Sequence, residues 1–375
     1  MSKKIRIKNQ EMDFVILILV LILTVFGIAM VFSASYYWAL DNPSEGPYYY
    51  LIKQAMWALG GFACLIIFSK LPYKIFGTRT VAVIAVAGTI GLLCLIFTPL
   101  GVSAGGATRW LKVGITIMPG EFAKLGVIIG TSAFLAEDPK KILSFKRGIL
   151  PLMIMAGVYG LLIYLQPNLS TAMVVVGLIV VIAIFAGLKF RYVFGAAGAL
   201  GVFAILLISV APNSYQVKRM MNFVDPFQDA LGDGYQAVQS LLALGSGGLF
   251  GRGIGKSVQK NLYIPEPQND FILSIIGEEL GFIGIIILMV LYAILIYRGF
   301  KVALNARDHL GMFLAGGITS MIAIQLIINI AVVTSSMPCT GITLPFISYG
   351  GNAMLMLMSS MGILLNISKY RKEAS

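Results

Sequence analysis

Long apolar segments, joined by mostly short polar connections, run through the whole chain. Each is close to the length of about 20 residues that an α-helix needs to cross a bilayer. The ten segments are roughly 13–33, 52–69, 77–98, 119–136, 148–165, 169–187, 191–210, 271–297, 310–334 and 344–367. The fourth is the least apolar, because it carries Glu121 and Lys124. The pattern predicts an all-α polytopic membrane protein, a single domain over 1–375 with about ten transmembrane helices.

Composition agrees with this pattern. Hydrophobic residues make up 58% of the chain and charged residues only 12%, which is too apolar for a soluble domain. The net charge of +12 would suit a nucleic-acid partner, but its distribution does not. With the N-terminus inside, most Lys and Arg residues fall in the inner connections, as the positive-inside rule describes. We therefore expect no nucleic-acid partner, and we expect both tails, 1–12 and 368–375, in the cytoplasm.

The first apolar segment invites a second interpretation. It follows the basic stretch KKIRIK, and SAS at 33–35 resembles a signal-peptide cleavage site. Its apolar core is longer than the roughly 7–15 residues of a signal peptide. We expect an uncleaved signal anchor.

One connection is far longer than the others. Residues 211–270 form a large predicted extracellular loop between the seventh and eighth helices. Loops of this length are uncommon unless they are functional or disordered. Within it, YQAVQSLLALGS at 235–246 has apolar residues at helical spacing. This spacing predicts an amphipathic helix in the plane of the lipid headgroups.

The stretch GSGGLFGRGIGKS at 245–257 resembles a nucleotide-binding loop only at its end. A P-loop needs G-x-x-x-x-G-K-[ST], and Phe250 stands where the first glycine is required. Two interpretations remain: a tight turn of permissive backbone, or a glycine-rich backbone that approaches an anionic ligand.

Polar residues gather in the predicted outer connections. Arg109 and Lys112 precede the fourth segment, and Glu121 and Lys124 open it at a spacing that lets them form an ion pair. Ionisable residues within spans indicate a cavity by default, although a self-neutralised pair is the alternative. QPNLST at 166–171 and PCTGITLPFISYGGNA at 338–353 lie on the same side. We expect one polar chamber there.

Asp270 is the strongest candidate for chemistry. If its helix has begun there, the step of about 100° per residue places Gly277, Gly281 and Gly284 beneath it, a stripe that lets another helix pack closely. Glu278 and Glu279 would then serve different faces, and Glu278 has a structural alternative as a bond to a neighbouring helix. A lone carboxylate suits a general base, and nearby cations suit a diphosphate leaving group.

Several stretches resemble one family over nearly the whole chain. They are GATRWLKVG, MPGEFAKL, FVDPFQDALGDGYQAVQSLLALGSGGLFGRGIG, IPEPQNDFI, IGEELGFIG and GITLPFISYGGNA. They are similar to those of the SEDS proteins, the FtsW, RodA and SpoVE group, and most similar to the FtsW and SpoVE branch. The resemblance implies ten spans and a peptidoglycan glycosyltransferase that polymerises lipid II at the outer leaflet, in cell division or spore cortex synthesis.

The resemblance also implies residue roles. Asp270 would be the catalytic base, and the substrate-binding residues would be Arg109, Lys112, Glu121, Lys124, Arg219, Gln239, Glu278, Ser348, Tyr349 and Gly350. A divalent cation, Mg2+ or Mn2+, is implied as a cofactor, but the sequence contains no identifiable ligand set. The implied partners are lipid II, a class B penicillin-binding protein and other division or sporulation membrane proteins. Asn168 departs from the family, which often has aspartate there.

Two other functions are compatible with such a chain. A lipid II flippase would carry polar groups through the bilayer midplane, whereas this sequence concentrates them on one side. A scaffold that only positions the penicillin-binding protein would not need Asp270, Glu121 and Lys124. The sequence therefore favours an enzyme of the bacterial cell membrane.

Overall fold

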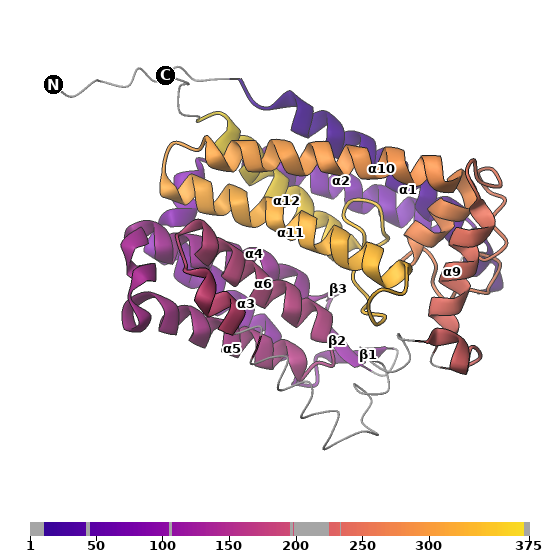
Figure 1. Ribbon diagram of the computed structural model, residues 1–375, viewed down its shortest axis with the longest axis horizontal. Helices are drawn as coiled ribbons and strands as arrows, with labels where there is room; N and C mark the ends of the chain where they lie inside the picture. Colours follow the sequence, from indigo (N-terminus) through magenta and orange to yellow (C-terminus); the bar gives the residue numbers. More distant parts are fainter. Residues whose placement is uncertain are drawn as a thin grey trace.

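The computed structural model describes residues 11–42, 46–104, 107–195, 198, 225–232 and 234–370. Its elements are α1 (Phe14–Asp41), α2 (Tyr49–Lys70), η1 (Tyr73–Gly77), α3 (Arg79–Leu95), β1 (Gly101–Ala104), β2 (Ala107–Val113), β3 (Ile115–Ile117), α4 (Pro119–Glu137), η2 (Pro139–Leu143), η3 (Phe145–Ile149), α5 (Leu150–Tyr164), α6 (Leu169–Phe185), η4 (Pro226–Asp229), α9 (Tyr235–Gly247), α10 (Ile272–Leu304), α11 (His309–Val333) and α12 (Gly351–Ser368). The long helices lie side by side as an elongated bundle (Figure 1).

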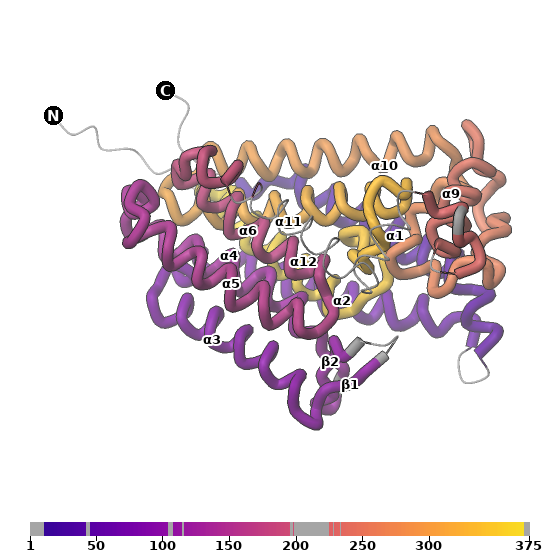
Figure 2. The backbone as a smooth tube through the Cα atoms, turned by 60° about the horizontal axis from the view of Figure 1, so that its bottom comes forward, coloured from indigo at the N-terminus to yellow at the C-terminus, as the bar shows by residue number. Residues whose placement is uncertain are grey.

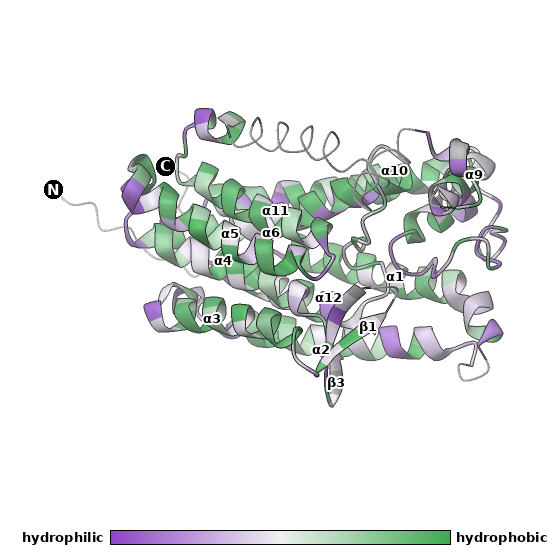
Figure 3. Ribbon diagram, turned by 90° about the horizontal axis from the view of Figure 1, so that it is seen from below, coloured by the Kyte–Doolittle hydropathy of each residue, from purple (hydrophilic) through white to green (hydrophobic). Residues whose placement is uncertain are grey.

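The helices match the predicted apolar segments. Among the described residues, six are long and apolar enough to cross a membrane, and α3 and α6 are shorter apolar helices. Apolar residues cover most of their length, and polar residues gather mainly toward the ends (Figure 3). The charged α4 occupies the fourth predicted segment, and the seventh, 191–210, lies largely outside the described residues. This arrangement is compatible with about ten spans.

A small antiparallel sheet of β1, β2 and β3 was not predicted. It lies at one end of the bundle, next to the right-hand end of α3 in the tube view (Figure 2), and we call this the sheet end. Leu111 pairs with Gly101 on one side and with Ile117 on the other, and its side chain is fully buried. The run Thr108 to Val113 is rich in the β-branched and aromatic residues that favour strands, so it forms a hairpin rather than an open loop.

The eighth predicted segment, 271–297, is wrong as one straight span. Gly281 has φ 69° and ψ −170°, so α10 is broken there, and the helix continues to Leu304. A Cβ on Gly277 would lie 2.9 Å from Ile285 Cδ1, although residues eight apart in a straight helix are separated by about 12 Å. The first part of α10, 272–280, therefore folds back along the second. The glycine stripe packs against its own helix and not only against another one.

The glycine-rich stretch fills the break. Arg252 N and Gly253 N donate to the carbonyls of Glu278 and Glu279, at 2.9 and 3.0 Å. On the other side of Gly281, Phe282 N and Ile283 N donate to Gly248 O and Leu249 O, at 2.9 and 3.1 Å. This stretch is thus a tight turn that supplies the hydrogen bonds that the broken helix lacks. The predicted helix at 235–246 is confirmed as α9, which packs against α10.

The last predicted segment, 344–367, begins too early. The helix α12 starts at Gly351, because the preceding residues form an irregular segment with positive φ at Gly341 and Phe346. We call residues 338–350 the crossing segment. Its prolines and glycines disfavour a helix, and its main chain is held by side chains from other helices.

Opposite the sheet end, polar contacts join the two described ends of the chain. Asp13 N donates to Ser368 Oγ at 3.0 Å, and Arg298 of α10 pairs with the Asp13 carboxylate at 2.9 Å. Nearby, Tyr73 donates its hydroxyl to Asp308 at 2.8 Å. The helices α1, α10 and α12 are therefore tied together at this end, away from the candidate site.

Candidate active site

Asp270 lies just before α10, at the tip of its folded-back first part. Its carbonyl oxygen accepts a hydrogen bond from Asn329 Nδ2 of α11 at 2.8 Å, and the same nitrogen donates to Ile342 O at 2.8 Å. A Cβ on Gly341 would lie 3.6 Å from Asp270 Oδ2. Asp270 thus lies between α11 and the crossing segment, and its half-buried side chain is close to Gly341.

The predicted motif before α12 lies beside Asp270. Its members are Ser348, Tyr349 and Gly350. Gln54 of α2 donates to Ser348 O at 3.2 Å and accepts from Gly350 N at 3.4 Å. Tyr349 N donates to Gln268 O at 2.9 Å, two residues before Asp270. These contacts align the crossing segment with the stretch that carries Asp270.

Glu121 and Lys124 form the predicted ion pair at the start of α4. Lys124 Nζ lies 2.7 Å from Glu121 Oε1, and both side chains are buried. Because the two charges neutralise each other, the pair adds little net charge to its surroundings. It offers polar atoms at the sheet end rather than a lone cation.

The sheet brings Arg109 to the link between α5 and α6. The Arg109 guanidinium donates to Pro167 O, while Lys112 is exposed on the same strand. Asn168, the departure from the family pattern, accepts a hydrogen bond from Thr171 N at 3.3 Å and caps α6. A capping role suits asparagine as well as aspartate, so this departure has a structural explanation.

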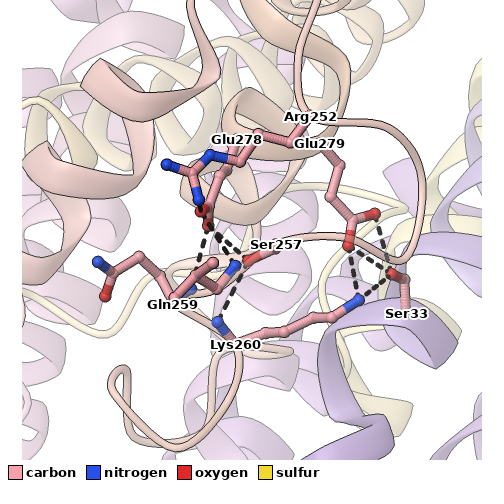
Figure 4. A network of polar contacts seen from close by, with 8 residues as sticks. Ser33, Arg252, Ser257, Gln259, Lys260, Glu278 and Glu279 are labelled. Atoms are coloured by element: carbon pink, nitrogen blue, oxygen red, sulfur yellow. Dashed lines mark hydrogen bonds and ion pairs between the residues drawn. The ribbon is translucent and has the colours of Figure 1, made fainter.

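Glu278 is fully buried and already surrounded by donors (Figure 4). Ser257 donates its hydroxyl, the backbone N–H groups of Val258 and Gln259 donate at 3.0 and 3.2 Å, and the Arg252 guanidinium lies 3.5 Å away. These contacts favour the structural alternative for Glu278, because little of its hydrogen-bonding capacity remains for a substrate.

Glu279 serves a different face, as the helical spacing predicted. Its carboxylate pairs with Lys260 at 2.8 Å and accepts from Ser33 of α1 at 2.7 Å. Lys260 also donates to Ser33 at 3.1 Å (Figure 4). Sequence reasoning missed Lys260 and Ser33 as partners, because they are far from Glu279 along the chain and no local spacing relates them.

The two remaining predicted site residues are Arg219 and Gln239. Arg219 lies outside the described residues. Gln239 is half-buried in α9, on the helix that packs against α10. The roles of all the predicted site residues in binding or catalysis therefore stay predictions.

The described residues do not form a ready-made metal site. Over the part of the chain that the structure describes, no three His, Cys, Asp or Glu side chains group together. At the start of α4, Glu121 is paired with Lys124. A divalent cation usually reaches a phosphate-binding site through one or two carboxylates and the substrate's own oxygens. The described residues alone therefore supply no complete ligand set for such an ion.

The fold and the site together define a polytopic, mainly helical membrane protein with polar groups converging near one end of its bundle. A family model described as a cell cycle protein, FtsW/RodA/SpoVE, matches residues 13–373. The chain belongs to this FtsW/RodA/SpoVE family.

Curated relatives match over nearly the full length. The stage V sporulation protein E of Bacillus subtilis (strain 168) is 40% identical over 97% of this chain and 99% of its own. A protein of Geobacter sulfurreducens (strain ATCC 51573 / DSM 12127 / PCA), named as a probable peptidoglycan glycosyltransferase FtsW, is 38% identical over 97% of each chain.

Two solved structures share the fold. A chain of a peptidoglycan synthase complex matches with a TM-score of 0.79 and 24% identity, over 95% of this chain and 97% of that one. The rod shape determining protein RodA of Thermus thermophilus matches with a TM-score of 0.70 and 24% identity, over 97% and 98%. At this identity the likeness concerns the architecture.

Proposed function

We propose that this chain is a peptidoglycan glycosyltransferase that polymerises lipid II into glycan strands, with Asp270 as the general base. The observation that carries the proposal is the placement of Asp270. Its main chain is fixed by Asn329, and its carboxylate faces the crossing segment. The relatives named as FtsW and as a sporulation protein support the reaction class and a role in division or sporulation.

The proposed reaction uses the Asp270 carboxylate as the base. Asp270 takes the proton from the 4-hydroxyl of the acceptor GlcNAc, and that oxygen attacks the anomeric carbon of the donor sugar. The bond between that carbon and the diphosphate oxygen breaks, and the electron pair leaves with the diphosphate. Because this anion is stabilised, it needs less acid help than an ordinary glycosidic leaving group.

Cations would hold the leaving diphosphate. Arg109 and Lys112 extend from β2, and Arg219 is the third candidate. Lys124 contributes less, because Glu121 neutralises it at 2.7 Å. A Mg2+ or Mn2+ ion would have to arrive with the diphosphate, since the described residues offer it no ligand set, and none of these steps depends on it.

The setting of the enzyme is part of the proposal. Both termini would be cytoplasmic, and the sheet end and the loop 211–270 would face the outside, where lipid II is presented. The positive-inside pattern supports this orientation. A class B penicillin-binding protein is the proposed partner, with other division or sporulation membrane proteins around it. The fold shared with a chain of a peptidoglycan synthase complex is compatible with such an assembly.

The test is polymerisation of purified lipid II in detergent, where no membrane remains to cross. Wild type and Asp270→Asn are compared with and without the class B partner, in Mg2+ and in Mn2+. We expect long glycan strands from wild type and none from a folded Asp270→Asn protein. Equal activity of the two proteins would remove Asp270 as the base. Absence of strands under every condition would favour a flippase or a scaffold, and liposome translocation would separate those two.

A further inference from the structure

Gln325 of α11 is a buried polar side chain without an evident purpose. Only 1% of its surface is exposed, and neither its Nε2 nor its Oε1 has a hydrogen-bond partner among the described residues. Buried amides nearly always have partners, and leaving one without them costs stability. A side chain that serves only packing would be apolar at this position. Both ends of this amide are therefore available to something that the folded chain does not itself supply.

The packing of α4 against α11 gives the level of Gln325. A Cβ on Gly317 would lie 3.0 Å from Ile128 Cγ2, so these two residues are opposite each other. Both helices extend to the sheet end, but α4 begins there whereas α11 runs toward it. From Ile128, Lys124 is about one turn and Glu121 about two turns closer to that end, and Gln325 is about two turns beyond Gly317. Gln325 therefore lies level with the Glu121–Lys124 pair.

The face of α11 is given by its other contacts. Gly317 and Ile324 lie against α6, while Thr319 lies against Gly299 of α10. At about 100° per residue, Gln325 falls between these two faces, toward the interior of the bundle. It also lies one turn from Asn329, which holds the main chain of Asp270. Gln325 thus lies on the same inward face of α11 as the residue that holds the main chain of Asp270.

Other polar atoms around Asp270 share this property. Asn329 Oδ1, Gln268 Oε1 and Thr340 Oγ1 are buried and make no hydrogen bond within the described residues. Two hydrogen bonds fix the orientation of the Asn329 amide, because its nitrogen donates to two carbonyl oxygens. Its oxygen is therefore an acceptor that receives no hydrogen bond within the described residues.

This set of atoms selects a class of ligand. A diphosphate offers only acceptors, so it cannot satisfy Asn329 Oδ1 or an amide oxygen. A sugar offers hydroxyl and acetamido groups, which both donate and accept. On the basis of the proposed function, we propose that Gln325, together with Asn329 Oδ1, forms an uncharged subsite that holds the acceptor sugar beside Asp270. Gln325 is then a substrate contact that sets the orientation of the attacking hydroxyl.

The test uses the full-length protein in detergent with two readouts. Gln325→Met keeps the length of the side chain and removes its hydrogen bonds. Thr319→Val is the matched control, because it is buried in the same helix and its hydroxyl already donates to Ala315 O. The probes are purified lipid II over a range of concentrations, for polymerisation, and a GlcNAc–MurNAc disaccharide without diphosphate, for a shift in melting temperature.

We expect Gln325→Met to lower the polymerisation rate at low lipid II about tenfold, the scale of a lost hydrogen bond that leaves its partner unpaired. Its own melting temperature should stay the same or rise, because a buried amide without partners is removed. The disaccharide should raise the melting temperature of wild type and Thr319→Val by about 2–4 °C and leave that of Gln325→Met unchanged.

Three results would overturn the subsite. One is full activity and a normal disaccharide shift in Gln325→Met, which would mean that water alone occupies the space. Another is a loss of activity that parallels a fall in melting temperature, which would assign Gln325 to packing. The third is the absence of a shift in wild type. A wild type that binds the disaccharide but makes no strands would refute the proposed function and leave the subsite supported.

Discussion

Two groups of buried polar side chains lie at opposite ends of the first part of α10, and they differ in how many of their polar atoms are hydrogen-bonded. Around Glu278 and Glu279, the carboxylates receive hydroxyl, ammonium and main-chain donors. Around Asp270, Gln325 and Asn329 retain buried atoms that have no partner among the described residues. The first group stabilises one arrangement of the chain. The second keeps hydrogen-bonding capacity for a ligand, at some cost in stability.

The largest loss of stability is expected when an ion pair of the group around Glu278 and Glu279 is removed. Lys260→Met leaves the Glu279 carboxylate buried without its ammonium partner, and we expect a loss of about 3–5 kcal/mol in the free energy of unfolding. Thermal unfolding in detergent measures it. In the double variant Lys260→Met with Glu279→Leu, both charges are gone and most of the stability should return. A single variant as stable as wild type would show that this ion pair does not hold the loop.

Two glycines of the turn beside α10 separate crowding from backbone strain. Gly251 and Gly255 both have positive φ, at 78° and 81°. A Cβ on Gly251 would lie 2.2 Å from Glu279 O, whereas nothing lies within 4 Å of one on Gly255. We expect Gly251→Ala to cost about 2–4 kcal/mol and Gly255→Ala about 1 kcal/mol, measured by thermal unfolding. Equal losses would contradict the close approach of the turn to α10.

At the candidate site around Asp270, a substitution should lower activity more than stability. Asn329→Leu removes both donors that hold Asp270 O and Ile342 O, at a cost of about 1–3 kcal/mol in unfolding free energy. Because Asp270 would lose its alignment, we expect the maximal rate of polymerisation to fall more than tenfold, a scale typical of misplaced catalytic groups. Rate measurements over a range of lipid II concentrations test this. A protein that is destabilised but fully active would show that Asn329 does not position the base.

The smallest effect is expected at the opposite end of the bundle. Burial, and then the hydrogen bond to Asp308, raise the pKa of Tyr73 above its ordinary value of 10.0. The neutral phenol is thus favoured in the folded state, and its stabilisation should be complete below pH 10 and lost as the pH rises further. Tyr73→Phe should lose about 1 kcal/mol at neutral pH and show a weaker alkaline decline. Unchanged polymerisation is the expected control result.

Much of the fold could be predicted from local patterns in the sequence. Apolar segments of sufficient length predicted the helices, and the spacing of Glu121 and Lys124 predicted their ion pair. The step from Glu278 to Glu279 predicted that they serve different faces. These predictions succeeded because each depends on residues within one or two turns of a helix.

The features of the fold and site that the sequence did not predict depend on contacts between segments that are distant along the chain. The fold-back of α10 requires Gly281 to meet Gly251, and the burial of Lys260 requires Ser33 from α1. Gln325 lies in an apolar run, one turn from Asn329, and only the contact of Asn329 with Asp270 O relates it to the candidate base. The candidate base itself could be predicted, because a carboxylate at the start of an apolar segment is costly.

The break at Gly281 also has a mechanical meaning. The first part of α10, 272–280, is a short arm. It is clamped at its base beside Gly281, and Asp270 lies at its tip. Four main-chain hydrogen bonds from 248–253 form the clamp, while Asn329 supports the tip. A small tilt of the clamp is magnified along a lever of about 16 Å, eleven residues at about 1.5 Å each. A load applied to α9 or to its glycine-rich turn is thereby converted into a displacement of the proposed base.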